Sequence, residues 1–252
     1  LKKVTDLEQF KKEISGRFGS SGQVLDRTAV IKLLAWHTPL DQDIESPDGA
    51  QAQEIQRSPP GVRYPYVLVM ELGERSLQDA VARERIAGFH LLEIREIMRC
   101  VAACLQKLHD GGVCHGDLKR KNVIQLRASD SSGGSKWVLC DMDGATRIGS
   151  ELDHQAKHST AYSPPELACY KFANGPPVVM SPSFDVWSFG IVLFEMCSGQ
   201  NLLMMDLNDD LINRNDQVRL TTWFCVDSEQ ARTELLRKGT ITRDSHKNRT
   251  MS

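Results

Sequence analysis

One short stretch, residues 115–122 (His-Gly-Asp-Leu-Lys-Arg-Lys-Asn), constrains this chain more than any other part of its sequence. It places a carboxylate at Asp117, a cation at Lys119 and an amide at Asn122 within one loop. Phosphoryl transfer needs these three groups together: a carboxylate for the attacking hydroxyl's proton, a positive charge at the migrating phosphate, and an oxygen ligand for Mg²⁺. Apolar residues at helical spacing from Ile94 to Leu108 predict a helix leading into the loop.

Three further motifs follow the loop in the order that this chemistry requires. Asp141 comes directly after an apolar run, Trp137-Val-Leu-Cys, that is typical of a strand. Tyr162-Ser-Pro-Pro-Glu166 comes next, and then Asp185-Val-Trp-Ser-Phe-Gly190, which opens an apolar segment typical of a core helix. Together with residues 115–122, these motifs resemble the catalytic loop, the magnesium-binding turn, the end of the activation segment and the following helix of protein kinases.

The resemblance implies an α+β fold with two lobes. Residues 1–72 are expected to form the small, mainly β lobe, which is short for this family. Residues 73–252 are expected to form the mainly α lobe, with its last helices incomplete and a disordered tail from about residue 240.

The resemblance also assigns the chemical roles. Asp117 is expected to orient the substrate hydroxyl and take its proton, and Lys119 to neutralise the γ-phosphate of ATP. Asn122 and Asp141 are expected to hold Mg²⁺. Ser159 matches the residue that hydrogen-bonds the catalytic Asp and Lys.

For the nucleotide, the resemblance implies a second set of residues upstream of the loop. Lys32, which ends the strand-like Ala29-Val-Ile-Lys, is expected to pair with the α- and β-phosphates of ATP. Met70 lies where the residue behind the adenine is expected, before a hinge whose backbone faces that base. The remaining expected ATP contacts are two phosphate-cradling glycines, three apolar residues around the adenine and two hinge residues: Gly19, Gly22, Val24, Val30, Ile124, Glu71 and Gly73.

Two features of this upstream set depart from the family pattern. Arg17 stands where the first glycine of the phosphate loop belongs, and the chain from Val24 to Lys32 is short for the usual strand, turn and strand. The glutamate that should pair with Lys32 is assigned to Glu54, in a helix-compatible stretch over residues 48–56. Glu45 is the weaker alternative, because Ser46-Pro47 follows it.

Local signals predict other elements of the fold. Ser76 is a good N-cap for a helix through Arg83. The turn-rich stretch 129–135 predicts a hairpin tip between two short strands. Glu229 to Lys238 could form one more helix.

Composition narrows the class of protein further. The formal net charge is −2, so no basic surface points to nucleic acid. The seven cysteines lie mostly in apolar runs and match neither a zinc site nor a disulfide framework, so we expect free thiols in a reducing, intracellular and cytoplasmic setting. No run reaches the roughly 18 apolar residues of a membrane span. The expected partners are ATP and a protein substrate, with the oligomeric state open.

Two functions fit the sequence. The first is a protein serine/threonine kinase that uses Mg·ATP, and Lys119, two residues after Asp117, is the pattern of Ser/Thr-specific members. The second is a pseudokinase or scaffold that binds partners without efficient turnover. It is favoured by Arg17 and Asp143, which stand where the family pattern has glycines. Gly116 replaces the usual arginine of the loop, which argues against control by phosphorylation of the activation segment.

Overall fold

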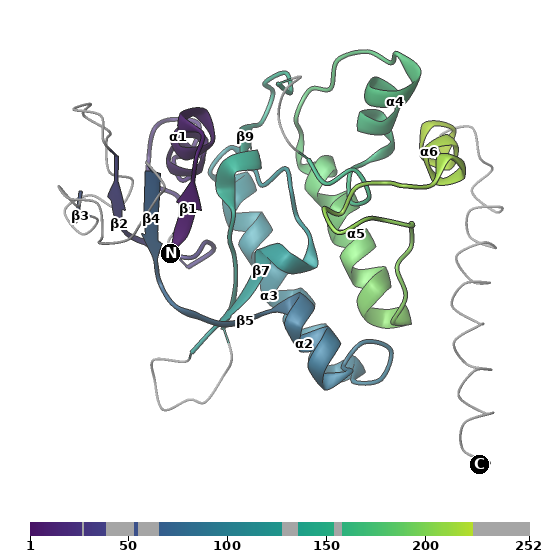
Figure 1. Ribbon diagram of the computed structural model, residues 1–252, viewed down its shortest axis with the longest axis horizontal. Helices are drawn as coiled ribbons and strands as arrows, with labels where there is room; N and C mark the ends of the chain where they lie inside the picture. Colours follow the sequence, from purple (N-terminus) through teal and green to yellow (C-terminus); the bar gives the residue numbers. More distant parts are fainter. Residues whose placement is uncertain (27, 39–52, 55–65, 128–135, 154–157, 224–252) are drawn as a thin grey trace.

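The computed structural model describes residues 1–26, 28–38, 53–54, 66–127, 136–153 and 158–223 (Figure 1). An N-terminal β-sheet with one helix lies at one side of the molecule, and the other helices lie beyond it. The predictions for the tip at 129–135, the helix at 229–238 and the tail from about 240 fall outside the described residues.

The N-terminal sheet has the order β1-β4-β2-β3. Strand β4 lies between β1 and β2 and is antiparallel to both, while β3 pairs in parallel with β2. The four strands are β1 (Lys2–Val4), β2 (Leu33–His37), β3 (Gln53–Glu54) and β4 (Tyr66–Met70). The helix predicted over residues 48–56 is therefore wrong at 53–54, where the backbone instead extends along β2.

Helix α1 (Leu7–Ser15) covers this sheet. Asp6 caps its N-terminus, since the carboxylate accepts a hydrogen bond from the Glu8 N–H at 2.7 Å. The apolar face of α1 presents Phe10 and Ile14, which are buried with residues of β1, β2 and β4. The ring of Phe10 stacks on that of Tyr66 at 5.2 Å between centroids. The helix is thereby fixed on the sheet by hydrophobic packing.

The rest of the described chain contains five helices, five short strands and two 3₁₀ turns. The helices are α2 (Leu77–Glu84), α3 (Leu91–Asp110), α4 (Pro165–Ala173), α5 (Pro182–Ser198) and α6 (Arg214–Thr221). The strands are β5 (Gly73–Ser76), β6 (Val113–Cys114), β7 (Val123–Leu126), β8 (Lys136–Leu139) and β9 (Thr146–Arg147), and the turns are η2 (Arg120–Asn122) and η3 (Met142–Gly144). Strands β5, β7 and β8 form one antiparallel sheet, and β6 pairs with β9.

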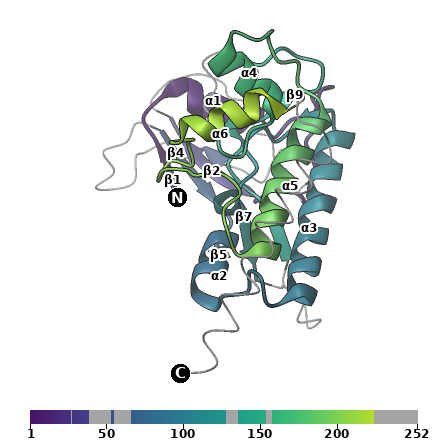
Figure 2. The ribbon, with the colours of Figure 1, turned by 90° about the vertical axis from the view of Figure 1, so that its right-hand side faces the viewer.

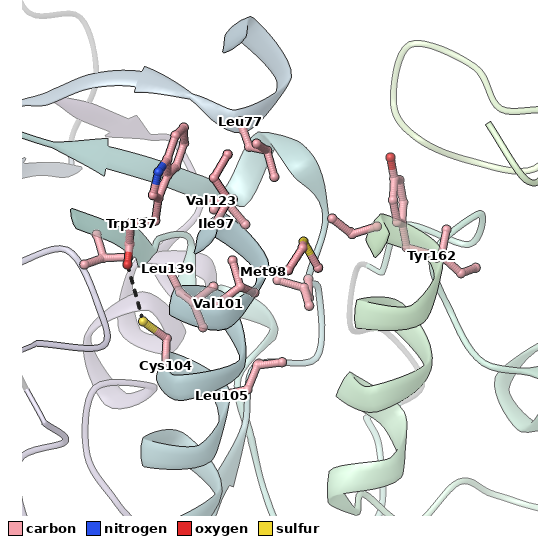
Figure 3. Close-up of a cluster of buried hydrophobic side chains, with 14 of the residues drawn as sticks. Leu77, Ile97, Met98, Val101, Cys104, Leu105, Val123, Trp137, Leu139 and Tyr162 are labelled. Atoms are coloured by element: carbon pink, nitrogen blue, oxygen red, sulfur yellow. Dashed lines mark hydrogen bonds between the residues drawn. The ribbon is translucent and has the colours of Figure 1, made fainter. Parts of the chain in front are cut away.

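The main hydrophobic core lies between α3 and the elements around it. Helices α3 and α5 run side by side (Figure 2). Figure 3 shows Ile97, Met98 and Val101 of α3 packed toward Val123 and Leu139 of the β7–β8 hairpin. At the edge of this cluster the thiol of Cys104 donates to the carbonyl oxygen of Trp137 at 3.5 Å. This core supports the loop at residues 115–122 and the turn after β8, which carry the predicted catalytic and magnesium-binding residues.

Several elements confirm the sequence predictions. Helix α3 contains the predicted segment 94–108, and α5 contains the apolar segment that opens at Asp185. Ser76 caps α2 as predicted, and it forms a reciprocal capping box with Asp79. The fold belongs to the α+β class that was expected.

Candidate active site

A cleft lies between the N-terminal sheet and the β5–β7–β8 sheet, with a cavity of about 470 Å³. The segment joining β4 to β5 forms one wall, and the end of β8 forms another. The lining residues are Leu1, Lys2, Ile31, Met70, Glu71, Leu72, Gly73, Arg75, Ser76, Asp79, Asn122, Ile124, Cys140 and Asp141.

Lys2, one of the two described cationic residues that line this cleft, pairs with carboxylates there. Its ammonium lies 2.8 Å from Oε2 of Glu13 on α1, and it forms a close ion pair with the carboxylate of Asp141. A third carboxylate, that of Asp143, lies 3.6 Å away. Strand β1 therefore delivers the lysine, α1 delivers the glutamate, and the turn after β8 delivers two aspartates to one point.

Glu13 is fully buried and is held by three donors. Besides Lys2, the guanidinium of Arg17 lies 2.8 Å from Oε1, and the backbone N–H of Met142 donates to Oε2 at 2.8 Å. Arg17 is buried as well and also donates to the Ile31 carbonyl oxygen at 2.5 Å. A buried carboxylate needs such charged partners, because desolvation without them would be very costly.

Lys32 does not lie in this cleft. Its side chain is exposed, and its backbone carbonyl accepts a hydrogen bond from the Glu71 N–H at 2.9 Å. The preceding residues run along β8, where the Ile31 N–H donates to the Leu139 carbonyl at 2.8 Å. With Val24 and Val30, Lys32 lines a separate, small cavity of about 20 Å³.

The expected phosphate-cradling glycines also lie elsewhere. Residues 16–24 form the turn that follows α1, closed by a bridge between Phe18 and Val24. The turn packs against the C-terminal end of α3, where the Ser20 N–H donates to the Gly111 carbonyl at 2.9 Å. None of Gly19, Gly22, Val24, Val30 and Lys32 lines the large cavity, so the upstream ATP-binding set does not come together as expected.

The predicted hinge residues, in contrast, line the large cavity. Met70 at the end of β4, then Glu71 and Gly73, line the cavity together with Ile124 of β7. Gly73 lets the two strands approach closely, because a Cβ atom at this position would lie 2.3 Å from Cγ2 of Ile124 and that side chain would have to move. This close approach lets β5 pair with β7 and brings Ile124 to the cavity floor.

The predicted catalytic residues form one hydrogen-bonded group. The Lys119 ammonium lies 2.9 Å from Oδ2 of Asp117 and donates to Oγ of Ser159 at 2.7 Å. The Ser159 N–H donates to Oδ1 of Asp117 at 3.0 Å. Asn122 donates from Nδ2 to the Asp117 backbone carbonyl at 2.9 Å, which ties the two ends of the loop together.

Electrostatics within the site favour charged lysines. Burial alone would lower the pKa of Lys2, but the carboxylates of Glu13, Asp141 and Asp143 outweigh it and raise that pKa. Burial likewise opposes the charge of Lys119, and the adjacent carboxylate of Asp117 raises its pKa above the ordinary value. Both ammonium groups therefore stay protonated at neutral pH.

Asp185 anchors the loop at residues 115–122 through two hydrogen bonds to its backbone. Its buried carboxylate accepts the N–H of His115 at 2.8 Å and the N–H of Gly116 at 2.9 Å. Gly116 has φ = +76°, and a Cβ there would lie 2.3 Å from the Gly144 carbonyl oxygen, so a glycine fits where a side chain would clash. The Gly116 carbonyl accepts a hydrogen bond from Nδ1 of the buried His158 at 2.9 Å.

Oxygen ligands for a divalent cation are present in the cleft. Asp141 and Asn122 both line the cavity, and the Nδ2 of Asn122 is already turned to Asp117, which leaves its amide oxygen for another partner. Carboxylate oxygens of Glu13, Asp141 and Asp143 also lie within 4.8 Å of one another. Hard oxygen donors of this kind suit Mg²⁺, so the residues present fit the expected ion.

Sequence reasoning missed Lys2 and Glu13. A signal for both was present, since Lys2-Lys3-Val4 precedes Asp6, a good N-cap residue, and an amphipathic stretch through Ile14. A strand bearing a lysine followed by a helix bearing a glutamate is the order that the lysine–glutamate ion pair of kinases requires. Lys32 has no such helix directly after it among the described residues.

The chain is similar to known proteins over most of its length. The family model described as "Protein kinase domain" matches residues 61–245. Three relatives are ribosomal protein S6 kinase alpha-2 of Mus musculus, the serine/threonine-protein kinase US3 homolog of varicella-zoster virus and ephrin type-B receptor 5 of Gallus gallus. They are 32%, 33% and 28% identical to this chain over 54%, 45% and 61% of its length, respectively.

The chain belongs to the protein kinase domain family, because that model covers well over half of it. It spans only 18%, 26% and 15%, respectively, of the length of the three relatives. Among the described residues, no helix is both long and apolar enough to cross a membrane.

Proposed function

Because the chain belongs to the protein kinase domain family, we propose that it transfers the γ-phosphate of ATP to serine or threonine hydroxyls of protein substrates. The observation that carries the proposal is the close grouping of Asp117, Lys119 and Ser159, near a cleft that holds Lys2 and Asp141. A carboxylate, an ammonium group and a hydroxyl grouped in this way support the proposal, because phosphoryl transfer needs such groups together. We further propose residues 1–72 and 73–252 as the two lobes of the domain.

In this proposal Asp117 orients the substrate hydroxyl and accepts its proton. Lys119 lies beside that carboxylate and neutralises charge on the transferred phosphoryl group. Ser159 fixes both residues through two hydrogen bonds. Lys119 at this place in the loop favours serine and threonine hydroxyls as acceptors.

We assign the phosphate-binding cation to Lys2 in place of Lys32, and its partner to Glu13 in place of Glu54. Lys2 lines the cleft beside Asp141, whereas Lys32 is exposed outside it. Glu13 orients the Lys2 ammonium toward the cavity, which is the purpose of such an ion pair. The Glu54 side chain lies outside what the structure describes.

Asn122 and Asp141 would hold Mg²⁺, which would neutralise phosphate charge when bound. The base of ATP would lie against Ile124, Ile31 and Met70, with hinge backbone groups of Glu71 and Gly73 beside it. Val24 and Val30, which the sequence suggested for this contact, lie outside the cavity. A compartment that supplies ATP and keeps thiols reduced is the setting this proposal implies.

A scaffold role without efficient turnover is the second candidate. The observation that favours it is the contact of Lys2 with Asp141, which pairs a cation directly with the proposed magnesium ligand. Asp143 adds another negative charge within 3.6 Å of that ammonium. If Lys2 stays paired with Asp141 and Asp143 and nucleotide does not bind, the fold serves as a binding module.

Phosphate transfer from γ-labelled ATP to a general protein substrate separates the two functions. Wild-type protein is compared with Asp117→Asn and with Asp110→Asn, an exposed aspartate at the end of α3 that serves as a matched control. The kinase proposal predicts transfer by wild type and Asp110→Asn, a loss of at least 100-fold in Asp117→Asn, and label on serine and threonine. Equal transfer by wild type and Asp117→Asn contradicts it, and label on tyrosine alone contradicts the stated specificity.

A further inference from the structure

Asp209 lies in the loop between α5 and α6, far along the chain from the catalytic loop. Asp206 builds this loop, since its carboxylate accepts the N–H groups of Asn208 and Asp210 at 2.8 and 2.9 Å. The Asp209 N–H also donates to the Asp206 carbonyl at 3.1 Å. The tight turn gives Asp209 a left-handed backbone with φ = +67°, which is uncommon for residues other than glycine and tolerated best by Asp and Asn.

The Asp209 side chain is buried and faces two lysines of the catalytic loop. The two carboxylate oxygens lie 2.8 and 3.0 Å from Nζ of Lys121, and Oδ2 lies 3.6 Å from Nζ of Lys119. The backbone carbonyl of Asp209 accepts the N–H of Ala161, two residues after Ser159, at 3.1 Å. One residue therefore joins the loop after α5 to both segments that carry the catalytic group.

The contact has an electrostatic consequence for Lys119. Its ammonium lies between the carboxylate of Asp117 at 2.9 Å and that of Asp209 at 3.6 Å. If Asp117 were its only carboxylate partner, the Lys119 ammonium would pair with Asp117 alone. Asp117 is the residue that must accept the substrate's proton, so this pairing would compete with that role. A second carboxylate on the other side shares the ammonium and limits how closely it is held by Asp117.

We infer that Asp209 is a positioning residue for phosphoryl transfer, whose carboxylate holds Lys119 and Lys121 in place from the loop after α5. The inference rests on the proposed function and adds a residue that the sequence motifs do not indicate. Lys121 contributes by fixing Asp209, since it also donates to the Leu207 carbonyl at 2.9 Å. Asp209 does not itself touch the reacting atoms.

The neighbouring carboxylate of Asp210 offers a matched control. Asp210 accepts two hydrogen bonds from Thr160, at 3.2 Å from its N–H and 2.9 Å from its hydroxyl. An asparagine oxygen can still accept both bonds, so Asp210→Asn removes the charge and keeps the contacts. Asp209→Asn keeps shape and backbone preference but removes the charge that pairs with the two lysines.

The test measures kcat and KM for ATP in wild type, Asp209→Asn and Asp210→Asn. The inference predicts that kcat falls about tenfold in Asp209→Asn, with KM for ATP changed less than threefold, while Asp210→Asn keeps the wild-type kcat. Equal kcat in all three proteins would overturn it, as would a loss in Asp209→Asn that appears only as a raised KM. If Asp209→Asn does not fold, Lys121→Met is measured in its place, and an unchanged kcat there overturns the inference.

A second readout does not depend on activity. Acetylation of individual lysines by a limiting reagent, resolved by peptide mass spectrometry, reports how strongly each ammonium is held. The inference predicts that Lys119 and Lys121 react several-fold faster in Asp209→Asn than in Asp210→Asn, and equal rates overturn it. If wild type transfers no more phosphate than Asp117→Asn, the proposed function fails, and the acetylation rates alone decide whether Asp209 holds the lysines.

Discussion

Met142 donates its backbone N–H to Oε2 of Glu13 at 2.8 Å and so joins α1 to the turn that follows β8. The same carboxylate pairs with Lys2 from β1 and with Arg17, which follows α1. The position of α1 on the sheet and the geometry around Asp141 are therefore one structural unit. Any change at Glu13 should affect both stability and the cleft.

Glu13→Gln should be strongly destabilising. The substitution leaves the ammonium of Lys2 and the buried guanidinium of Arg17 facing a neutral amide, and breaking a buried pair in this way costs about 3–5 kcal/mol. Urea denaturation measures the free energy of unfolding. Glu8→Gln, on an exposed position of the same helix, should stay within about 0.5 kcal/mol of wild type. A cost below about 1 kcal/mol for Glu13→Gln would contradict the described network.

Asp143 and Gln9 should be energetically coupled, because they meet where α1 contacts η3. The Gln9 side-chain amide donates to Oδ2 of Asp143 at 2.6 Å, and both side chains lie at the junction of α1 and η3. A double-mutant cycle with Gln9→Ala and Asp143→Ala should give a coupling energy of about 1.5–3 kcal/mol, as for a hydrogen bond to a charged group. Additive effects within about 0.3 kcal/mol would show that the bond contributes nothing to stability.

His158 should make the protein less stable in acid. Burial lowers the pKa of its imidazole, and the hydrogen bond to the Gly116 carbonyl offsets this only in part. The unfolded chain therefore binds a proton below about pH 6.5 that the folded chain resists, so stability is lost as the pH falls from about 6.5. Buried Nε2 has no hydrogen-bond partner among the described residues, which adds to the cost of its protonation.

His158→Asn provides the comparison for this effect. The asparagine amide can donate to the Gly116 carbonyl as Nδ1 does, and it does not titrate. The free energy of unfolding, measured from pH 7.5 to 5, should fall more steeply in wild type than in the variant. Parallel curves would show that His158 binds its proton equally in the folded and unfolded states.

The loop around Asp117 could be predicted from the sequence because its chemistry is contiguous. Lys119 and Asn122 lie within a few residues of Asp117, and the structure brings their side chains into contact with Asp117. The hinge was similarly local, since Met70, Glu71 and Gly73 follow one another at the end of a strand. Functional residues that lie close together along the chain form a motif that can be recognised in the sequence.

The part of the cleft that the N-terminal sheet and α1 form was harder to predict, because its residues come from separate elements. Ala29-Val-Ile-Lys32 follows a glycine turn and has the composition of a lysine-bearing strand, so local pattern favoured Lys32. Tertiary packing instead sends Lys32 outward and lays residues 29–31 along β8. The pairing of Lys2 with Glu13 depends on how α1 packs on the sheet, and the strand and helix signals around these residues do not by themselves specify that packing.

Calorimetric titration with ATP, in the presence and absence of Mg²⁺, tests the central claim that Lys2 and not Lys32 serves the nucleotide site. Wild type, Lys2→Met and Lys32→Met are compared, since each variant removes one ammonium and keeps a side chain of similar length. The account predicts Mg²⁺-dependent binding by wild type and Lys32→Met with equal Kd, and at least tenfold weaker binding by Lys2→Met. Weakened binding in Lys32→Met with wild-type affinity in Lys2→Met would contradict it, and so would the absence of binding by folded wild-type protein.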